Sequence, residues 1–91
     1  RHLAFVKGKL YYATSSASKG RIYEALNDKV IAERDGRILA MIATEKEIYD
    51  AGFYGVYKIS FDDRGNIIEE KQIFDKEATS LLIVDRSVVK I

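Results

Sequence analysis

Side chains that carry acid–base or nucleophilic chemistry are scarce in this sequence. His2 is the only histidine, and the chain contains no cysteine. An isolated imidazole has no second ligand with which to hold zinc and no nucleophile to activate, so we interpret His2 as a solvated residue. Without cysteine, disulfides and thiolate metal sites are excluded. The sequence therefore predicts no catalytic residue, no cofactor site and no metal site, and it favours a protein that is not an enzyme.

Two polar segments have ligand-binding residue types without the spacing that binding needs. The segment from Ser15 to Gly20 combines serines, a lysine and a glycine, but it lacks the glycine spacing and the ending of a phosphate-binding Walker loop. Asp62, Asp63 and Asn66 offer oxygen ligands, but the segment lacks the alternating ligands and the terminal glutamate of a calcium-binding hand. We interpret the first segment as a hairpin loop and the second as a turn.

Composition narrows the class of protein further. Fifteen basic and fourteen acidic side chains leave a net charge of +1, which gives no basic footprint for nucleic acid. The apolar runs, such as residues 81–84, are too short to span a bilayer, so we expect no membrane partner. The sequence has one methionine and no cysteine but many charged residues, a bias typical of thermophiles. That bias favours an intracellular location.

An internal repeat of roughly forty residues organises the chain, a spacing typical of repeat architectures. Three segments each consist of an apolar run, a short polar turn and a second apolar run: LAFVKGKLYYA, LAMIATEKEIYDA and LLIVDRSVVKI, at residues 3–13, 39–51 and 81–91. The first two segments are followed by GRIY and GVY, and then by VIAE and IIEE. We therefore divide a single domain into repeats at about 3–36 and 39–78, with a partial repeat at 80–91.

Residue types within the repeats favour strands. Valine, isoleucine, tyrosine and phenylalanine concentrate in short runs separated by Asp, Asn and Gly, the residues that tight hairpin turns need. Around Tyr57, the alternation of residue types predicts that Tyr57, Ile59 and Phe61 face the core. An α+β alternative places two short helices at about 22–34 and 37–51, where apolar residues also fall at helical spacing. The matching turns of the repeats favour an all-β fold, because helices would not need them.

The repeat resembles the blade of a β-propeller of the Asp-box type. KLYYATSSASKGRIYEA (residues 9–25) and EIYDAGFYGVYKIS (residues 47–60) carry the likeness, and SFDDRG (residues 60–65) resembles the Asp-box turn with one extra residue before the glycine. The resemblance implies antiparallel four-stranded blades. Because propellers close with four to eight blades, two and a quarter blades imply a fragment of a longer propeller or a self-associating chain.

Two hypotheses about function follow from the resemblance, and a third follows from the α+β alternative. The first hypothesis is a propeller-like binding or scaffold module that holds a protein partner or associates with itself. The second is a non-catalytic piece of a propeller enzyme, such as a glycoside hydrolase. A small α+β domain of unknown function is the third hypothesis.

Aromatic residues provide the candidate contacts with a partner. Four tyrosines recur at matching positions of the repeats, and we therefore expect them to pack between blades: Tyr11, Tyr23, Tyr49 and Tyr57. Phe53 and Tyr54 do not recur, and they lie in a loop between two expected strands. Because aromatic residues are enriched at protein interfaces, we predict Phe53 and Tyr54 as an exposed contact with a partner.

Overall fold

A computed structural model describes residues 2–84 and 87–90 of the chain, and within them it contains strands but no helix. The strands are β1 (His2–Val6), β2 (Lys9–Ser15), β3 (Gly20–Glu24), β4 (Lys29–Arg34), β5 (Ile38–Ala43), β6 (Glu47–Gly52), β7 (Gly55–Phe61), β8 (Ile67–Phe74), β9 (Leu81–Val84) and β10 (Ser87–Lys90). The all-β prediction is confirmed. No helix that could cross a membrane occurs in this part of the chain.

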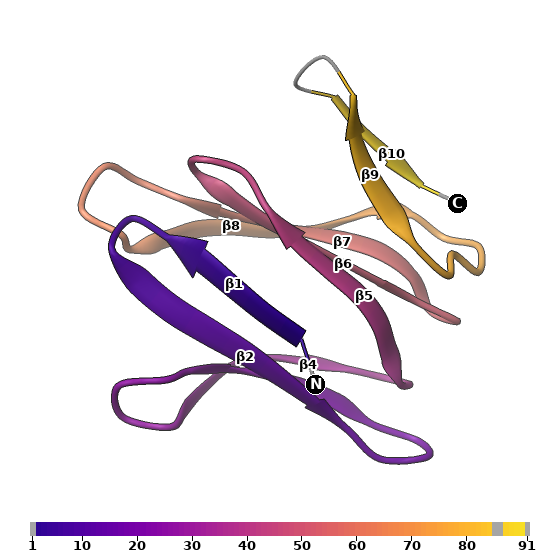
Figure 1. The fold of residues 1–91 in the computed structure, drawn as a ribbon. Coiled ribbons are helices and arrows are strands. Elements are labelled where there is room, and N and C mark those ends of the chain that lie inside the picture. The colour runs from indigo at the N-terminus through magenta and orange to yellow at the C-terminus, as the bar shows by residue number, and fades with distance from the viewer. Residues whose placement is uncertain (1, 85–86, 91) are drawn as a thin grey trace.

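The strands form three layers (Figure 1). Sheet 1 is the four-stranded antiparallel meander β1–β4, and sheet 2 is the equivalent meander β5–β8. The hairpin β9–β10 forms the third layer, and β9 lies against β5 and β6 of sheet 2. Sheet 2 therefore lies between sheet 1 and the hairpin.

The alternative with helices at 22–34 and 37–51 is wrong, because these segments form strands β3 to β6. Two β-bulges interrupt the strand alternation in these segments. One falls in the β3–β4 pairing after Ile22, and the other falls in the β5–β6 pairing between Ile38 and Ala40. A bulge inserts one extra residue into a strand, so apolar side chains no longer recur at every second residue.

The main core lies between sheet 1 and sheet 2. Tyr11 of β2 meets Phe61 of β7, with ring centroids 5.4 Å apart. Around this pair, both sheets contribute buried apolar side chains: Ala4, Val6, Ala13, Ile22, Ala32, Ile38, Met41, Ile48 and Ile59. Ile59 and Phe61 face this core, as the alternation around Tyr57 predicts, and Tyr57 itself is partly buried.

A second, smaller core lies on the opposite face of sheet 2. Ala51, Val56 and Ala78 are buried there, and Tyr49 and Leu81 pack against them. Leu81 begins β9, so this core joins sheet 2 to the third layer. Sheet 2 thus has a core on each of its faces.

Matching rows of residues face these two cores. In sheet 1, paired residues across β2, β3 and β4 form the row Ala13–Ile22–Ala32, which packs on sheet 2. In sheet 2, paired residues across its four strands form the row Ala40–Ala51–Val56–Phe74, which packs beneath the third layer. Ala13 and Ala51 occupy the same position in their repeats. Each sheet therefore turns the same row toward the layer that follows it.

Candidate binding surface

The face of sheet 1 that points away from sheet 2 carries a continuous set of apolar side chains. One row crosses all four strands through paired residues and consists of Leu3, Tyr12, Tyr23 and Val30. Phe5 and Leu10 form a second row beside it. Directly paired residues point to the same side of a sheet, so these six side chains share one surface, which we call the outer face.

Large apolar side chains on the outer face are open to solvent. Leu3 and Phe5 are 62% and 64% exposed, and Leu10 and Val30 are each 42% exposed. A hollow of about 360 Å³ at one end of the outer face is lined by Phe5, Leu10 and the neighbouring turn residue Leu26, which is 92% exposed. Contiguous apolar patches of several hundred Å² on a soluble protein mark interaction sites.

Polar contacts hold the centre and rim of the outer face in place. The rings of Tyr12 and Tyr23 stack with centroids 4.9 Å apart, and the Tyr12 hydroxyl donates a hydrogen bond of 2.7 Å to Asp28. At the rim, Arg21 Nε lies 2.7 Å from Glu33 Oε2. This pairing raises the pKa of Arg21 and lowers the pKa of Glu33, so both groups stay charged and neutralise each other. The outer face therefore has a stacked aromatic centre, with the Asp28 carboxylate beside Tyr12 and a neutral ion pair at the rim.

The opposite face of sheet 1 contains a buried charged residue, Arg34. Arg34 of β4 points toward sheet 2 and donates two hydrogen bonds to Asp50 of β6, Nε to Oδ2 at 2.7 Å and Nη2 to Oδ1 at 2.9 Å. Its Nη1 also donates to the Glu33 carbonyl at 2.9 Å and to the Glu70 carboxylate. The guanidinium carbon lies 3.9 Å from the centroid of the Tyr57 ring. Arg34 thus ties the two sheets together.

The pKa values of Arg34 and Tyr54 are raised, which keeps both side chains protonated as hydrogen-bond donors. Burial works to lower the pKa of Arg34, but the hydrogen bonds and charges of Asp50 and Glu70 outweigh it and raise that pKa. The Tyr54 hydroxyl donates a 2.6 Å hydrogen bond to Asp50. Burial, followed by the Asp50 charge, raises the pKa of Tyr54, which keeps this hydroxyl protonated. The cluster acts as a structural link between the two sheets.

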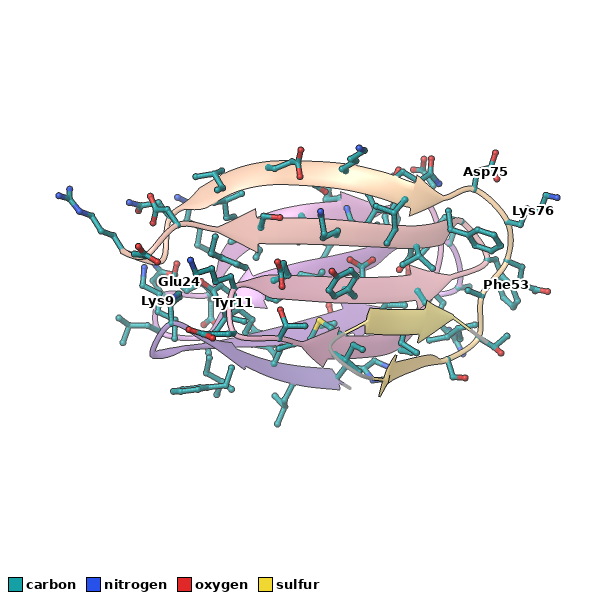
Figure 2. The ribbon with its side chains drawn as sticks, turned by 90° about the horizontal axis from the view of Figure 1, so that it is seen from above. Lys9, Tyr11, Glu24, Phe53, Asp75 and Lys76 are labelled. Atoms are coloured by element: carbon teal, nitrogen blue, oxygen red, sulfur yellow. The ribbon has the colours of Figure 1, made fainter. Side chains whose placement is uncertain are left out.

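The predicted contact residues Phe53 and Tyr54 point in different directions. Phe53 is 61% exposed in the β6–β7 turn, beside the segment of Asp75 and Lys76 (Figure 2). Tyr54 is partly buried, and its ring tilts against Tyr57 with centroids 5.7 Å apart. The hydrogen bond to Asp50 turns the Tyr54 hydroxyl inward, so Tyr54 is less exposed than expected. The contact of Phe53 and Tyr54 with a partner stays a prediction.

Polar residues of the two expected turns take part in local structure. Ser15 ends β2, and its Oγ accepts a 2.9 Å hydrogen bond from the Ile38 amide, which links sheet 1 to the start of sheet 2. Asp62 accepts hydrogen bonds from the backbone amides of Asn66 and Arg64, each at 2.9 Å. The Asn66 amide, with a smaller contribution from Arg64, lowers the pKa of Asp62. These contacts stabilise turns of the backbone.

Two further features involve charged side chains. Asp63 lies 3.2 Å from Lys46 and 3.7 Å from Lys7, and the hydrogen bond to Lys46 is the main cause that lowers its pKa. His2, Ser15 and Arg37 line a hollow of about 530 Å³ where β1, β2 and β5 meet. Within residues 2–84 and 87–90, no three His, Cys, Asp or Glu side chains gather in a way that could hold a metal ion.

Sequence reasoning missed the outer face, although a signal for it exists. In β1, Leu3 and Phe5 alternate with Ala4 and Val6, so both sides of the strand are apolar. A strand that is apolar on both sides is one that is covered on both sides. Sheet 2 covers Ala4 and Val6, whereas Leu3 and Phe5 stay open in the part of the chain that the structure describes.

Comparisons of this chain with models of protein families, with curated proteins and with solved structures find no match. Its function is therefore argued from its own residues.

Proposed function

We propose that this chain is a β-propeller-like binding and scaffold module, in which sheets 1 and 2 are blades and the outer face holds a protein partner. The observation that carries the proposal is the repetition of one packing mode. Ala13 and Ile22 face sheet 2 just as Ala51 and Val56 face the third layer. Blades of a propeller pack in this head-to-tail manner, each turning the same row toward the next.

The order of the strands supports the same proposal. Each sheet is a meander in which neighbours in sequence are neighbours in space. The first strands of successive layers also lie near one another, β1 beside β5 and β5 beside β9. Propeller blades place their first strands together around a central axis in this way.

The chemistry of the outer face favours a protein as the partner. Its aromatic and aliphatic side chains resemble the centre of a protein–protein interface, where charged residues are depleted. The ion pair at its rim, between Arg21 and Glu33, contributes no net charge, and the Asp28 carboxylate accepts a hydrogen bond from Tyr12. A surface of this kind has no attraction for a phosphate backbone, which requires clustered lysine and arginine.

One glutamate placed at three positions tests the arrangement. Ala13→Glu and Ala51→Glu put a charge into the two cores, so each should lower the free energy of unfolding by about 3 kcal/mol or more. Ile68→Glu is the matched control, because it introduces the same charge at a position of β8 that is 65% exposed and lies outside the outer face, and exposed positions change stability by only about 0.5 kcal/mol. Urea unfolding measures all three variants. If Ala51→Glu were tolerated as well as Ile68→Glu, the third layer would not pack as a blade, and the proposal would fail.

A further inference from the structure

We infer that the partner of the outer face is a second copy of this chain, whose own outer face packs against it in a two-fold symmetric dimer. This inference rests on the proposed function only in treating the outer face as a binding surface.

A second copy suits the outer face because each copy carries the same open apolar surface. The rows that face the two cores are not open to it: the row with Ala13 and Ile22 is buried against sheet 2, and the equivalent row around Ala51 is covered by Ala78 and Leu81. Head-to-tail stacking through the third layer would instead grow beyond a dimer. Among the residues that the structure describes, the large apolar sheet face left open on a second copy is again the outer face. A contact of a surface with itself closes by two-fold symmetry.

The size of the outer face suits a dimer. The exposed parts of its six apolar side chains, together with Arg21 and Glu33 at the rim, come to roughly 700 Å², close to the roughly 800 Å² per partner of a specific interface. Packing two sheets face to face at a separation of about 10 Å would bury most of this surface.

The arrangement of charge and aromatic rings also suits self-association. Because Arg21 and Glu33 neutralise each other within one copy, this pair adds no repulsion between two outer faces, and the nearby Asp28 carboxylate accepts the Tyr12 hydrogen bond. The stacked rings of Tyr12 and Tyr23 lie in the middle of the row, flanked by Leu3 and Val30. Aromatic anchors surrounded by aliphatic side chains are the pattern that dominates binding energy at interfaces.

Sedimentation equilibrium of the full chain over a range of micromolar concentrations tests the inference. The wild-type chain should reach twice the monomer mass and stop there. Phe5→Lys should raise the dimer dissociation constant by about a hundredfold or more, because a two-fold dimer contains each substitution twice. Phe53→Lys is the matched control: Phe53 is 61% exposed and Phe5 64%, but Phe53 lies in the β6–β7 turn away from the outer face. The Phe53 variant should remain a dimer.

Three results would overturn the inference: a wild-type monomer at several hundred micromolar, growth beyond a dimer, or dissociation by Phe53→Lys. Leu10→Lys provides a second variant of the outer face, and unfolding curves establish that each variant is folded. The failures of the two proposals are distinguishable. A monomeric wild type with intolerance of Ala51→Glu would leave the blade arrangement standing and remove only the second copy as the partner.

Discussion

Two arginine–carboxylate pairs in this protein have the same nitrogen–oxygen distance, but one pair is buried and the other is exposed. Comparing them separates the effect of burial from the effect of distance. In each pair, the arginine Nε lies 2.7 Å from a carboxylate oxygen. Arg34 and Asp50 are 2% and 0% exposed, whereas Arg21 and Glu33 are 46% and 54% exposed. A buried charge that loses its partner cannot recover its hydration, so we expect the cost of breaking a pair to follow burial and not distance.

The structure also orders the effects within the buried pair. Asp50→Ala leaves Arg34 with the Glu70 carboxylate and a backbone carbonyl, so the loss should be about 3 kcal/mol, the lower end for a broken buried pair. Arg34→Ala leaves Asp50 with the Tyr54 hydroxyl as its remaining side-chain donor among the described contacts. This variant also loses the contact with the Tyr57 ring, and we expect about 5 kcal/mol.

Urea unfolding at neutral pH measures these losses, with the double variant Arg34→Ala/Asp50→Ala completing a mutant cycle. The double variant should lose less than the sum of the single losses, because neither charge is left unpaired. Arg21→Ala, the exposed control, should leave the urea midpoint essentially unchanged at protein concentrations where the chain is monomeric. Losses below about 1 kcal/mol for both single variants of the buried pair would refute the reasoning, as would a control that loses as much as they do.

The other predictions concern turns. Turn amides lower the pKa of Asp62, so its charge contributes stability that is present above about pH 4 and is lost as the pH falls through the lower folded pKa. The difference in urea midpoint between wild type and Asp62→Asn should therefore be present at pH 7 and shrink as the pH falls below the ordinary aspartate pKa; a difference that stayed constant into strong acid would contradict this. Gly55 has a φ of 115°, and a Cβ there would lie 2.0 Å from a backbone oxygen. Thermal unfolding should therefore show a loss of stability several times larger for Gly55→Ala than for Gly8→Ala, because a Cβ at Gly8 has no atom within 4 Å. Equal losses would show that the positive φ of both glycines, and not the contact at Gly55, sets the loss of stability. Ser15→Ala removes a hydrogen bond to β5 and should cost about 1 kcal/mol, whereas Ser18→Ala should stay within about 0.5 kcal/mol; indistinguishable urea midpoints would rule out the link between sheets.

The strands could be predicted because their signals are local. Around Tyr57, alternation places Ile59 and Phe61 on the core side, and the structure agrees. Alternation is a property of one strand, since successive side chains point to opposite faces. The bulges at Ile22 and Ile38 disturb this period, and those segments were also the ones compatible with helices. Pairing between strands decided between helix and strand in these segments, and the sequence of one segment carries no information about that pairing.

The candidate sites were less predictable because they depend on contacts between segments distant in sequence. Phe53 and Tyr54 are neighbours of similar chemistry, and nothing local separates them. Their directions differ because Asp50, buried by the other sheet, accepts the Tyr54 hydroxyl. The buried pairing of Arg34 with Asp50 is equally hidden, because charged residues in a strand usually face solvent.

Residue types and turn spacing alone determined that this chain forms hairpins of short strands in repeats, because strand pleat and turn geometry act over a few residues. The tertiary structure decided which side of each strand is covered. Leu3 and Ala4 are adjacent and both apolar, but Ala4 is buried against sheet 2 while Leu3 is 62% exposed on the outer face. The physical reason is that burial requires a neighbouring layer. The packing of sheet 1 on sheet 2, fixed by the main core and the pairing of Arg34 with Asp50, leaves the other face of the first sheet open in the part of the chain that the structure describes.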